Sequence, residues 1–367
     1  MRKGWEYKKL GEVCDIYQPK TISTDMLSKD GEYPVYGANG VIGYYHQYNH
    51  EDKEVLLTCR GATCGNINVS KPYSWINGNA MVIHRKSEFI DFDFLKYMML
   101  SLDYSLIITG AAQPQITRQK LAPIKIAIPP KSTQLAIVSE LDKINELIRL
   151  KKEQLKDFDN LAQSLFYEMF GDPVENEKGW DVKKLKDISR EIGDGLHGTP
   201  EYSEVDTGCY FINGNNLENG TIVIKENTKM VSEKTKAKHY IEMDDFTILV
   251  SINGTLGKVA FYNGENVILG KSACYIKLEA YNDKKYIFEL LKSDYFKRYA
   301  ESECTGTTIR NVSLKSMRNF RCPLPPLPLQ RLFAQRIEQI EREKSEVQKS
   351  IQDLETLLAS RMQYWFE

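Results

Sequence analysis

The feature that most constrains this sequence is that it repeats itself. Residues 4–10 (GWEYKKL) return as residues 179–185 (GWDVKKL), and a looser match links residues 60–67 to residues 252–259. From residue 109 onward the offset between matching residues settles at 196, compared with 175 at the start. The chain is therefore a tandem duplication of a unit of about 180 residues. Its second copy carries 21 additional residues.

The first part of each copy is typical of a compact α/β domain. It is rich in Gly, Asn, Tyr and β-branched residues, and short apolar runs between turn residues predict strands at residues 55–58, 80–83, 247–250 and 273–276. An amphipathic pattern interrupts these strands and predicts one helix in each copy, near residues 92–105 and 284–300.

The second part of each copy predicts one long helix. A double proline precedes it, at Pro129-Pro130 and at Pro325-Pro326, and prevents a helix from continuing out of the domain before it. Beyond the prolines, mostly apolar residues alternate at spacings of three and four from Leu141 to Met169 and from Ile337 to Trp365, which predicts helices over about residues 131–170 and 327–366. A seam of this kind needs a partner helix, and the chain supplies two seams that are expected to pack on each other.

The connections determine the direction of this pair. The first helix leads from the first domain to the second, so the second helix can pair with it only by running back, and the coiled coil is antiparallel. Helices of about 40 residues would form a rod of roughly 60 Å. The predicted fold class is α/β (α+β) domains in tandem duplicate, joined by an antiparallel two-helix coiled-coil spacer as a pseudo-twofold dumbbell. The expected boundaries are 1–128 (domain 1), 129–172 (central spacer helix), 173–324 (domain 2) and 325–367 (C-terminal spacer helix).

The composition argues against several classes of protein. The seven cysteines are scattered without a CxxC pair, which argues against a disulfide framework and a zinc site. No apolar run approaches the ~18 residues of a membrane helix, and the N-terminal segment lacks the apolar stretch of a secretory signal. We therefore expect a cytoplasmic protein without a metal site or a membrane-spanning segment. The 49 basic and 50 acidic residues exclude nucleic-acid binding by bulk charge alone.

Two related domains on a fixed spacer suit a ligand that offers two sites at a set distance and with opposite polarity. Duplex DNA is such a ligand, because its helical turn repeats every 34–36 Å or so. A symmetric scaffold that joins two protein partners would have the same organisation, so both hypotheses stay open at this point.

The sequence resembles the specificity subunit of type I restriction–modification enzymes. Residues 33–44 (YPVYGANGVIGY) are similar to the opening of one class of target recognition domain. Residues 110–116 (GAAQPQI), followed by IAIPP and Gln134, resemble the end of such a domain, where it enters a long helix. The second copy retains residues 306–309 (GTTI) and 324–326 (LPP) but lacks the Gln-Pro pair. The resemblance covers essentially the whole chain.

The resemblance implies a subunit that is not itself an enzyme. Each target recognition domain would recognise one half of a split, asymmetric double-stranded DNA sequence, and the helix pair would set the gap. Two methyltransferase (modification) subunits, which modify adenine N6 with S-adenosylmethionine, would dock around the helices, and restriction/translocase subunits driven by ATP and Mg would join them. No cofactor is expected in this chain, which also lacks a GxxxxGK[ST] phosphate loop.

Direct base recognition needs Arg, Lys, Asn, Gln, Ser or Thr on rigid loops. The candidates in domain 1 are Arg60, Thr63, Asn66, Asn77, Asn79, Gln113, Gln115, Thr117 and Arg118. The candidates in domain 2 are Asn213, Asn215, Asn216, Asn253, Thr255, Lys258, Lys271, Thr307, Thr308, Arg310 and Asn311. The alternative is that Asn and Thr in Gly-rich segments form turns by bonding their own backbone. Arg60 and Arg310 are the strongest candidates, because Arg can grip phosphate as well as guanine.

Three functional hypotheses remain. The first is a DNA-recognising adaptor in a restriction–modification complex, and the second is a duplicated protein-only scaffold that does not bind DNA. Salt-sensitive, sequence-selective retention of DNA would separate these two. The third is a self-sufficient methyltransferase or nuclease. The absence of the corresponding sequence motifs argues against it, and turnover by the purified chain would argue for it. The near-neutral charge predicts weak DNA binding by the isolated chain.

Overall fold

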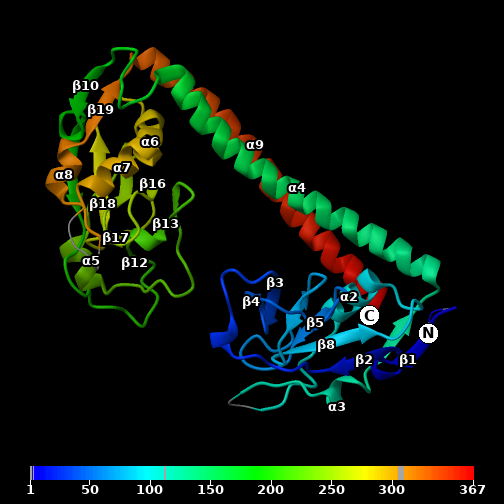
Figure 1. The fold of residues 1–367 in the computed structure, drawn as a ribbon. Helices are drawn as coiled ribbons and strands as arrows, with labels where there is room; N and C mark the ends of the chain where they lie inside the picture. Colours follow the sequence, from blue (N-terminus) through cyan, green and yellow to red (C-terminus); the bar gives the residue numbers. More distant parts are fainter. Residues whose placement is uncertain (1, 3, 111–112, 305–309) are drawn as a thin grey trace. The chain divides into compact units, whose positions relative to one another are not determined.

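The computed structural model describes residues 2, 4–110, 113–304 and 310–367, and the chain divides into two compact units. Unit 1 comprises Met1–Glu153 and Gln348–Glu367, and unit 2 comprises Gln154–Val347. Each unit therefore contains the domain of one copy together with parts of both long helices (Figure 1). Within the described part of the chain, no helix combines the length and the apolar character needed to cross a bilayer.

Domain 1 is built around a four-stranded antiparallel sheet in the order β2-β8-β5-β6. A smaller sheet has the order β4-β3-β7, and β1 pairs with β9. The strands are β1 (Glu6–Lys9), β2 (Cys14–Tyr17), β3 (Tyr33–Gly37), β4 (Gly40–Tyr45), β5 (Val55–Thr58), β6 (Ile67–Val69), β7 (Trp75–Ile76), β8 (Ala80–Arg85) and β9 (Lys125–Ile128). The helices are α1 (Leu10–Val13), α2 (Phe92–Ser101) and α3 (Arg118–Leu121).

Domain 2 repeats this plan with the sheet order β11-β18-β15-β16, and β10 pairs with β19 as β1 does with β9. The strands are β10 (Asp181–Lys184), β11 (Ser189–Asp194), β12 (Tyr210–Ile212), β13 (Leu217–Glu218), β14 (Thr221–Ile222), β15 (Thr247–Ser251), β16 (Val259–Phe261), β17 (Val267–Leu269), β18 (Ala273–Leu278) and β19 (Arg321–Leu324). The helices are α5 (Glu233–His239), α6 (Lys284–Lys292), α7 (Asp294–Ser302) and α8 (Leu314–Asn319), with short 3-10 turns η2 (Leu185–Ile188) and η3 (Gly214–Asn216). The sheet orders confirm that the duplication predicted from sequence is structural.

The four strands predicted most clearly all form, because they are the buried centre of each sheet. β5 and β15 are buried along their whole length, and β8 and β18 over their first four residues. The single helix predicted near residues 284–300 is wrong, since it is split into α6 and α7. Ser293 has an extended backbone between them and accepts a hydrogen bond from the Phe296 amide, so it ends one helix and caps the next.

The two long helices are α4 (Lys131–Phe170) and α9 (Leu327–Phe366), over the residues expected for them. In unit 1, Leu141 near the start of α4 shares a core with Leu358 near the end of α9. In unit 2 the relation is reversed, since Phe166 near the end of α4 packs with Ile337 near the start of α9. Within each unit the helix segments therefore pair in antiparallel fashion, as the connections predicted (Figure 1).

Ion pairs between the helices accompany the apolar seam. In unit 2, Lys344 Nζ lies 2.8 Å from Asp159 Oδ1. In unit 1, the Arg361 guanidinium forms a two-point contact with the Glu140 carboxylate, and this hydrogen-bonded contact holds the pKa of Glu140 below its usual value. Both pairs are partly exposed, so each is expected to select the register of the helices more than to stabilise them.

A buried glutamine attaches each long helix to its own domain. Gln134, fully buried in the first turn of α4, accepts a hydrogen bond from the Asp91 amide at 2.8 Å and donates to the Phe89 and Pro129 carbonyls. Gln330 of α9 repeats this arrangement, accepting from the Asp283 amide at 3.0 Å and donating to the Pro325 carbonyl at 2.8 Å. Asp91 and Asp283 cap α2 and α6, so each glutamine joins a spacer helix to the helix of its domain.

The last carbonyls of both long helices are also capped alike. Lys178 Nζ donates to Glu168 O and Met169 O at the end of α4, and the Trp180 indole donates to Phe170 O. At the end of α9, the Arg2 guanidinium donates to the Tyr364 and Trp365 carbonyls. A cation before each Gly-Trp motif therefore satisfies carbonyls that a helix end leaves unpaired.

Candidate nucleic-acid interface

Three polar loops meet at one end of the main sheet of domain 1. Thr58 at the end of β5 pairs with Ala80 at the start of β8, so the loops that follow β5 and precede β8 lie at the same end. The segment before α3 joins them, because the Ile116 amide donates to Cys59 O and the Gly61 amide donates to Pro114 O, both at 3.0 Å. We call residues 59–66, 77–79 and 113–118 the polar edge of domain 1.

Domain 2 forms the same edge with different side chains. Ser251 at the end of β15 pairs with Ala273 at the start of β18. The Val312 amide donates to Ile252 O at 2.9 Å, and the Gly254 amide donates to Arg310 O at 3.0 Å. Residues 213–216 join the edge through the Gly214 amide, which donates to Ser272 Oγ at 3.0 Å. We call residues 213–216, 252–258, 270–272 and 310–313 the polar edge of domain 2.

Glycines determine the shape of the loop that follows the central strand. Gly61 and Gly65 in domain 1 have φ of 88° and 101°, and Gly254 and Gly257 in domain 2 have 73° and 72°. The second glycine of each pair returns its amide to the end of the strand, at Thr58 O (2.9 Å) or Ser251 O (3.0 Å). Because side chains rarely adopt this backbone conformation, the glycines hold the loop in one shape while the residues between them differ.

Most of the residues predicted to bind DNA lie on these edges. In domain 1 the exposed candidates are Arg60, Thr63, Asn66, Asn79, Gln113, Gln115 and Arg118, while Thr117 is half-buried. In domain 2 the exposed candidates are Asn215, Thr255, Lys271 and Arg310, while Asn213, Asn253, Lys258 and Asn311 are half-buried. The structure therefore brings together, at one edge per domain, candidates that are widely separated in the sequence.

Two candidates are wrong as DNA contacts, because their side chains point into the protein. Asn77 is 4% exposed, and its Oδ1 accepts hydrogen bonds from the Ile22 amide and the Trp75 indole. Asn216 is 8% exposed and bridges the Asn213 amide to Val223 O. Both serve as the turn formers that the alternative interpretation described. Thr307 and Thr308 lie outside the described residues.

Arg60 and Gln115 form a pair of neighbouring polar side chains. They face each other in an antiparallel bridge, so their side chains lie on the same face of the loop pair. Neither side chain has a hydrogen-bond or ion-pair partner among the residues that the structure describes. Asn253 and Asn311 occupy the matching bridge in domain 2. Arg310 is less available, because its guanidinium lies 3.6 Å from the Glu301 carboxylate.

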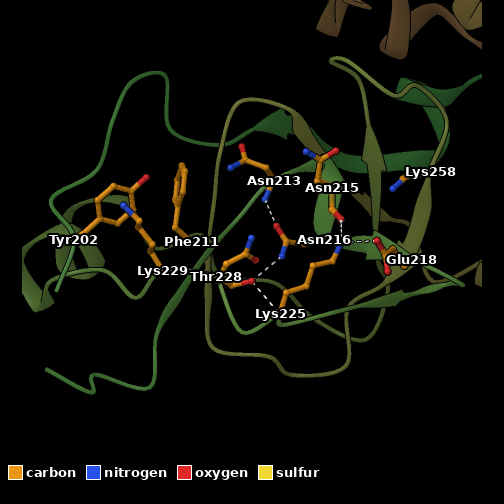
Figure 2. A pocket seen from close by; sticks show the side chains of 11 residues that line it. Tyr202, Phe211, Asn213, Asn215, Asn216, Glu218, Lys225, Thr228, Lys229 and Lys258 are labelled. Carbon is orange, nitrogen blue, oxygen red and sulfur yellow. Dashed lines mark hydrogen bonds and ion pairs between the residues drawn. The ribbon is translucent and has the colours of Figure 1, made fainter. Parts of the chain in front are cut away.

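A basic hollow extends the edge of domain 2, and two of its lysines were not predicted from the sequence. It encloses about 460 Å³ and includes the candidates Asn213, Asn215 and Lys258 together with Lys225 and Lys229 (Figure 2). Lys225 Nζ lies 2.6 Å from Glu218 Oε1, and this hydrogen bond lowers the pKa of Glu218. These lysines belong to the stretch in which the second copy is longer, so no match in domain 1 could identify them.

The described residues of the two edges supply hydrogen-bonding and cationic groups. Burial raises the pKa of the Cys59 and Cys64 thiols, which disfavours their nucleophilic thiolate form. No cluster of three or more His, Cys, Asp or Glu that could hold a metal ion occurs in residues 2, 4–110, 113–304 and 310–367. Amides, hydroxyls and cations on rigid loops are instead the groups that recognise bases and phosphates.

Comparison with known proteins agrees with this arrangement. Residues 2–157 and 177–356 match the family model of the type I restriction modification DNA specificity domain. The type I restriction enzyme MjaVIII specificity subunit of Methanocaldococcus jannaschii is 20% identical over 393 residues, which cover 96% of this chain and 92% of that protein.

Solved structures share the fold. The S subunit of a type I restriction–modification system from M. genitalium superposes with a TM-score of 0.54 at 14% identity, over 99% of this chain and 96% of that chain. A chain from a study of complex assembly and conformational transition of the type I R-M system gives a TM-score of 0.63 at 18% identity, over 99% and 97%. The match to the model of a DNA specificity domain supports the DNA-recognition hypothesis over the protein-only scaffold. The family model matches the chain twice, and the two matches together cover most of the chain. The chain therefore belongs to the family of type I restriction–modification specificity subunits, with two DNA-recognition domains.

Proposed function

We propose that the chain recognises a bipartite, asymmetric double-stranded DNA sequence, with one half contacted by the polar edge of each domain. The observation that carries this proposal is the repetition of the edge by matched hydrogen bonds: Ile116 to Cys59 in domain 1 and Val312 to Ile252 in domain 2. The side chains on these equivalent frames differ, with Arg60 and Gln115 in one and Asn253 and Asn311 in the other. Different donors and acceptors on the same frame favour two different half-sites.

In this proposal α4 and α9 set the unread gap between the half-sites, and chemistry belongs to partner subunits in the cytoplasm. Two methyltransferase subunits would supply S-adenosylmethionine chemistry, and restriction/translocase subunits would supply ATP and Mg. The chain itself would bring no cofactor. The duplicated attachment of each helix to its domain, through Gln134 and Gln330, supports the role of the helices as a spacer.

The outer surface of α4 supports the docking of a methyltransferase subunit. Leu135 and Leu147 are 49% and 48% exposed and, with Val138, line a shallow apolar hollow in unit 1. Exposed leucines on a helix that already buries another face are typical of a protein-binding surface. The hollow also contains Asp142, Lys143 and Glu146, which would form its polar rim.

We expect the double substitution Leu135→Asp and Leu147→Asp to reduce capture of the methyltransferase subunit at least tenfold. The aspartates would place charges where apolar contact is proposed, while the fold should be retained because both positions are half-exposed. Affinity co-purification from cells that co-express both proteins measures the effect. Asn160→Asp, an exposed change on the same helix, is the control. If the double aspartate variant captures the methyltransferase subunit as well as the wild type does, this surface is not the docking site.

Methylation mapping tests the proposed function. The chain is co-expressed with the methyltransferase encoded beside its gene, and methylated adenines in host DNA are located by single-molecule sequencing. The proposal predicts a split motif, with two short specific blocks around a gap of fixed length. A short continuous motif, or no methylation despite an active methyltransferase, would contradict it.

A further inference from the structure

We infer that the basic hollow of domain 2 binds the sugar-phosphate backbone of the DNA beside the half-site that this domain recognises. The inference rests on the proposed function and adds a phosphate-binding site to it. The residues that line the hollow are Tyr202, Phe211, Asn213, Asn215, Asn216, Glu218, Lys225, Asn227, Thr228, Lys229 and Lys258.

The charge of the hollow favours an anion. Three lysines line it, whereas Glu218 is its only carboxylate among the described residues. Lys225 neutralises Glu218, so two positive charges remain. Lys229 Nζ lies 4.7 Å from the centre of the Tyr202 ring. The charge of Lys258 helps to lower the pKa of Glu218, but Lys258 Nζ makes no ion pair or hydrogen bond within the described ranges. Two ammonium groups that no carboxylate contacts directly are available for phosphate oxygens.

The arrangement suits an extended ligand. Figure 2 shows Lys229 at the Tyr202 end and Lys258 at the Glu218 end, with Asn213 and Asn215 between them. The side-chain amide of Asn215 makes no hydrogen bond within the part of the chain that the structure describes. Cations at both ends and an amide between them match a backbone segment, whose phosphates alternate with neutral sugars. A single small anion would engage one end only.

The location ties the hollow to the polar edge of domain 2. Asn213 Oδ1 accepts a hydrogen bond from Ser272 Oγ at 3.0 Å, and Ser272 adjoins the candidate Lys271. The Lys258 amide donates to Ser251 Oγ, also at 3.0 Å, at the end of β15. DNA whose bases contact the edge would therefore bring its backbone close to these lysines, and phosphate contacts of this kind set the position of the duplex.

The described part of domain 1 presents a different surface beside the matching strand, β5. There Thr58 donates to Ala38 O in the turn between β3 and β4, and Val41 and Ile42 on β4 are about half exposed, at 48% and 47%. The lysine-bearing loop after β14 lies in the stretch where the second copy is longer. The two domains would therefore differ in how strongly salt weakens their hold on DNA.

The test removes the three charges and measures the salt dependence of binding. The complex of the chain with its methyltransferase subunits is prepared as wild type and with Lys225→Gln, Lys229→Gln and Lys258→Gln combined. Its affinity for a duplex that carries the mapped motif is measured by fluorescence anisotropy between 50 and 400 mM KCl. Each lost phosphate contact should reduce the slope of log K against log [salt] by about 0.9, so the loss of the two available ammonium groups should reduce the slope of the triple variant by about 1.8.

The matched control is Lys183→Gln, Lys184→Gln and Lys186→Gln combined. It makes the same change in net charge at the opposite end of the sheet, because these residues lie in or near η2, beside Ser189 and its partner Leu278. The control should lose less than 1 unit of slope. Equal slopes for the two triple variants would overturn the inference.

Two further outcomes separate the possible failures. Loss of complex assembly on size-exclusion chromatography, with an unchanged slope in any remaining complex, would mean that the hollow binds an acidic partner segment, and it would overturn the DNA assignment. If the wild-type complex shows no split motif, the proposed function itself fails. If the wild type shows a split motif and the slope of the triple variant is unaltered, the inference about the hollow is wrong and the proposed function stands.

Discussion

Replacing Gln134 by leucine is expected to destabilise the attachment of α4 to domain 1 by about 3 kcal/mol. Each buried polar group that loses its hydrogen-bond partner costs roughly 1–3 kcal/mol. The change removes the hydrogen-bond partner of the Asp91 amide and of the Phe89 and Pro129 carbonyls, because the fully buried Gln134 side chain bonds all three. Leucine has a similar volume, so the loss should come from unpaired backbone groups more than from a cavity. Gln330→Leu should have a comparable effect in domain 2 through the Asp283 amide.

Hydrogen exchange followed by mass spectrometry measures this effect unit by unit. Gln134→Leu should speed exchange in peptides that contain Asp91 and α2, while peptides that contain Asp283 and α6 stay as in the wild type. Gln330→Leu should produce the converse pattern. Gln163→Leu, at an exposed position of α4, is the control and should change neither. Wild-type exchange around Asp91 in the Gln134 variant would show that the glutamine does not hold the helix to its domain.

Arg60→Ala is expected to slow methylation at the mapped motif by about 5- to 150-fold, because a good contact between an arginine and a base is worth roughly 1–3 kcal/mol. Arg60 is exposed, and its bridge to Gln115 places both side chains on one face of the polar edge of domain 1. Gln115→Ala should have a smaller effect at a position within the same block. Neither change should alter the block that domain 2 recognises.

Methylation rates on duplexes that carry every single-base variant of the motif measure both effects. The Arg60 variant should lose discrimination at one position, in addition to losing rate. Lys86→Ala is the control, because Lys86 follows the far end of β8, away from the polar edge. An Arg60 variant with wild-type rate and wild-type discrimination would contradict the assignment of this edge. Relaxed discrimination in the block of domain 2 would contradict the division of labour between the domains.

The extent of the long helices could be predicted closely because two independent signals agree there. The double prolines at 129–130 and 325–326 end the preceding segment, and the alternation of three and four continues to Met169 and Trp365, one residue before each helix ends. The division between α6 and α7 was missed because the amphipathic pattern continues across it. The signal was present, however, since Ser293 followed by Asp294 is typical of a helix start.

The sequence indicated which loops carry exposed polar side chains better than it indicated which individual side chains are exposed. Arg60 and Gln115 could be named because Arg and Gln have long polar side chains that rarely bury. Asn77 and Asn216 could not be told apart from their exposed neighbours, because the direction of a turn side chain depends on which backbone amide needs a partner. The lysines of the basic hollow were missed because they lie in a loop of domain 2 that the first copy lacks.

Exchange of one domain tests the central claim, that each domain independently recognises one block of a split motif. Residues 1–128 are replaced by the equivalent residues of a specificity subunit with a different known motif, and the methylated adenines are mapped with the same methyltransferase. The account predicts that one block changes to that of the donor, while the other block and the gap length are retained. A change in both blocks, or an unchanged motif from an active chimera, would contradict it.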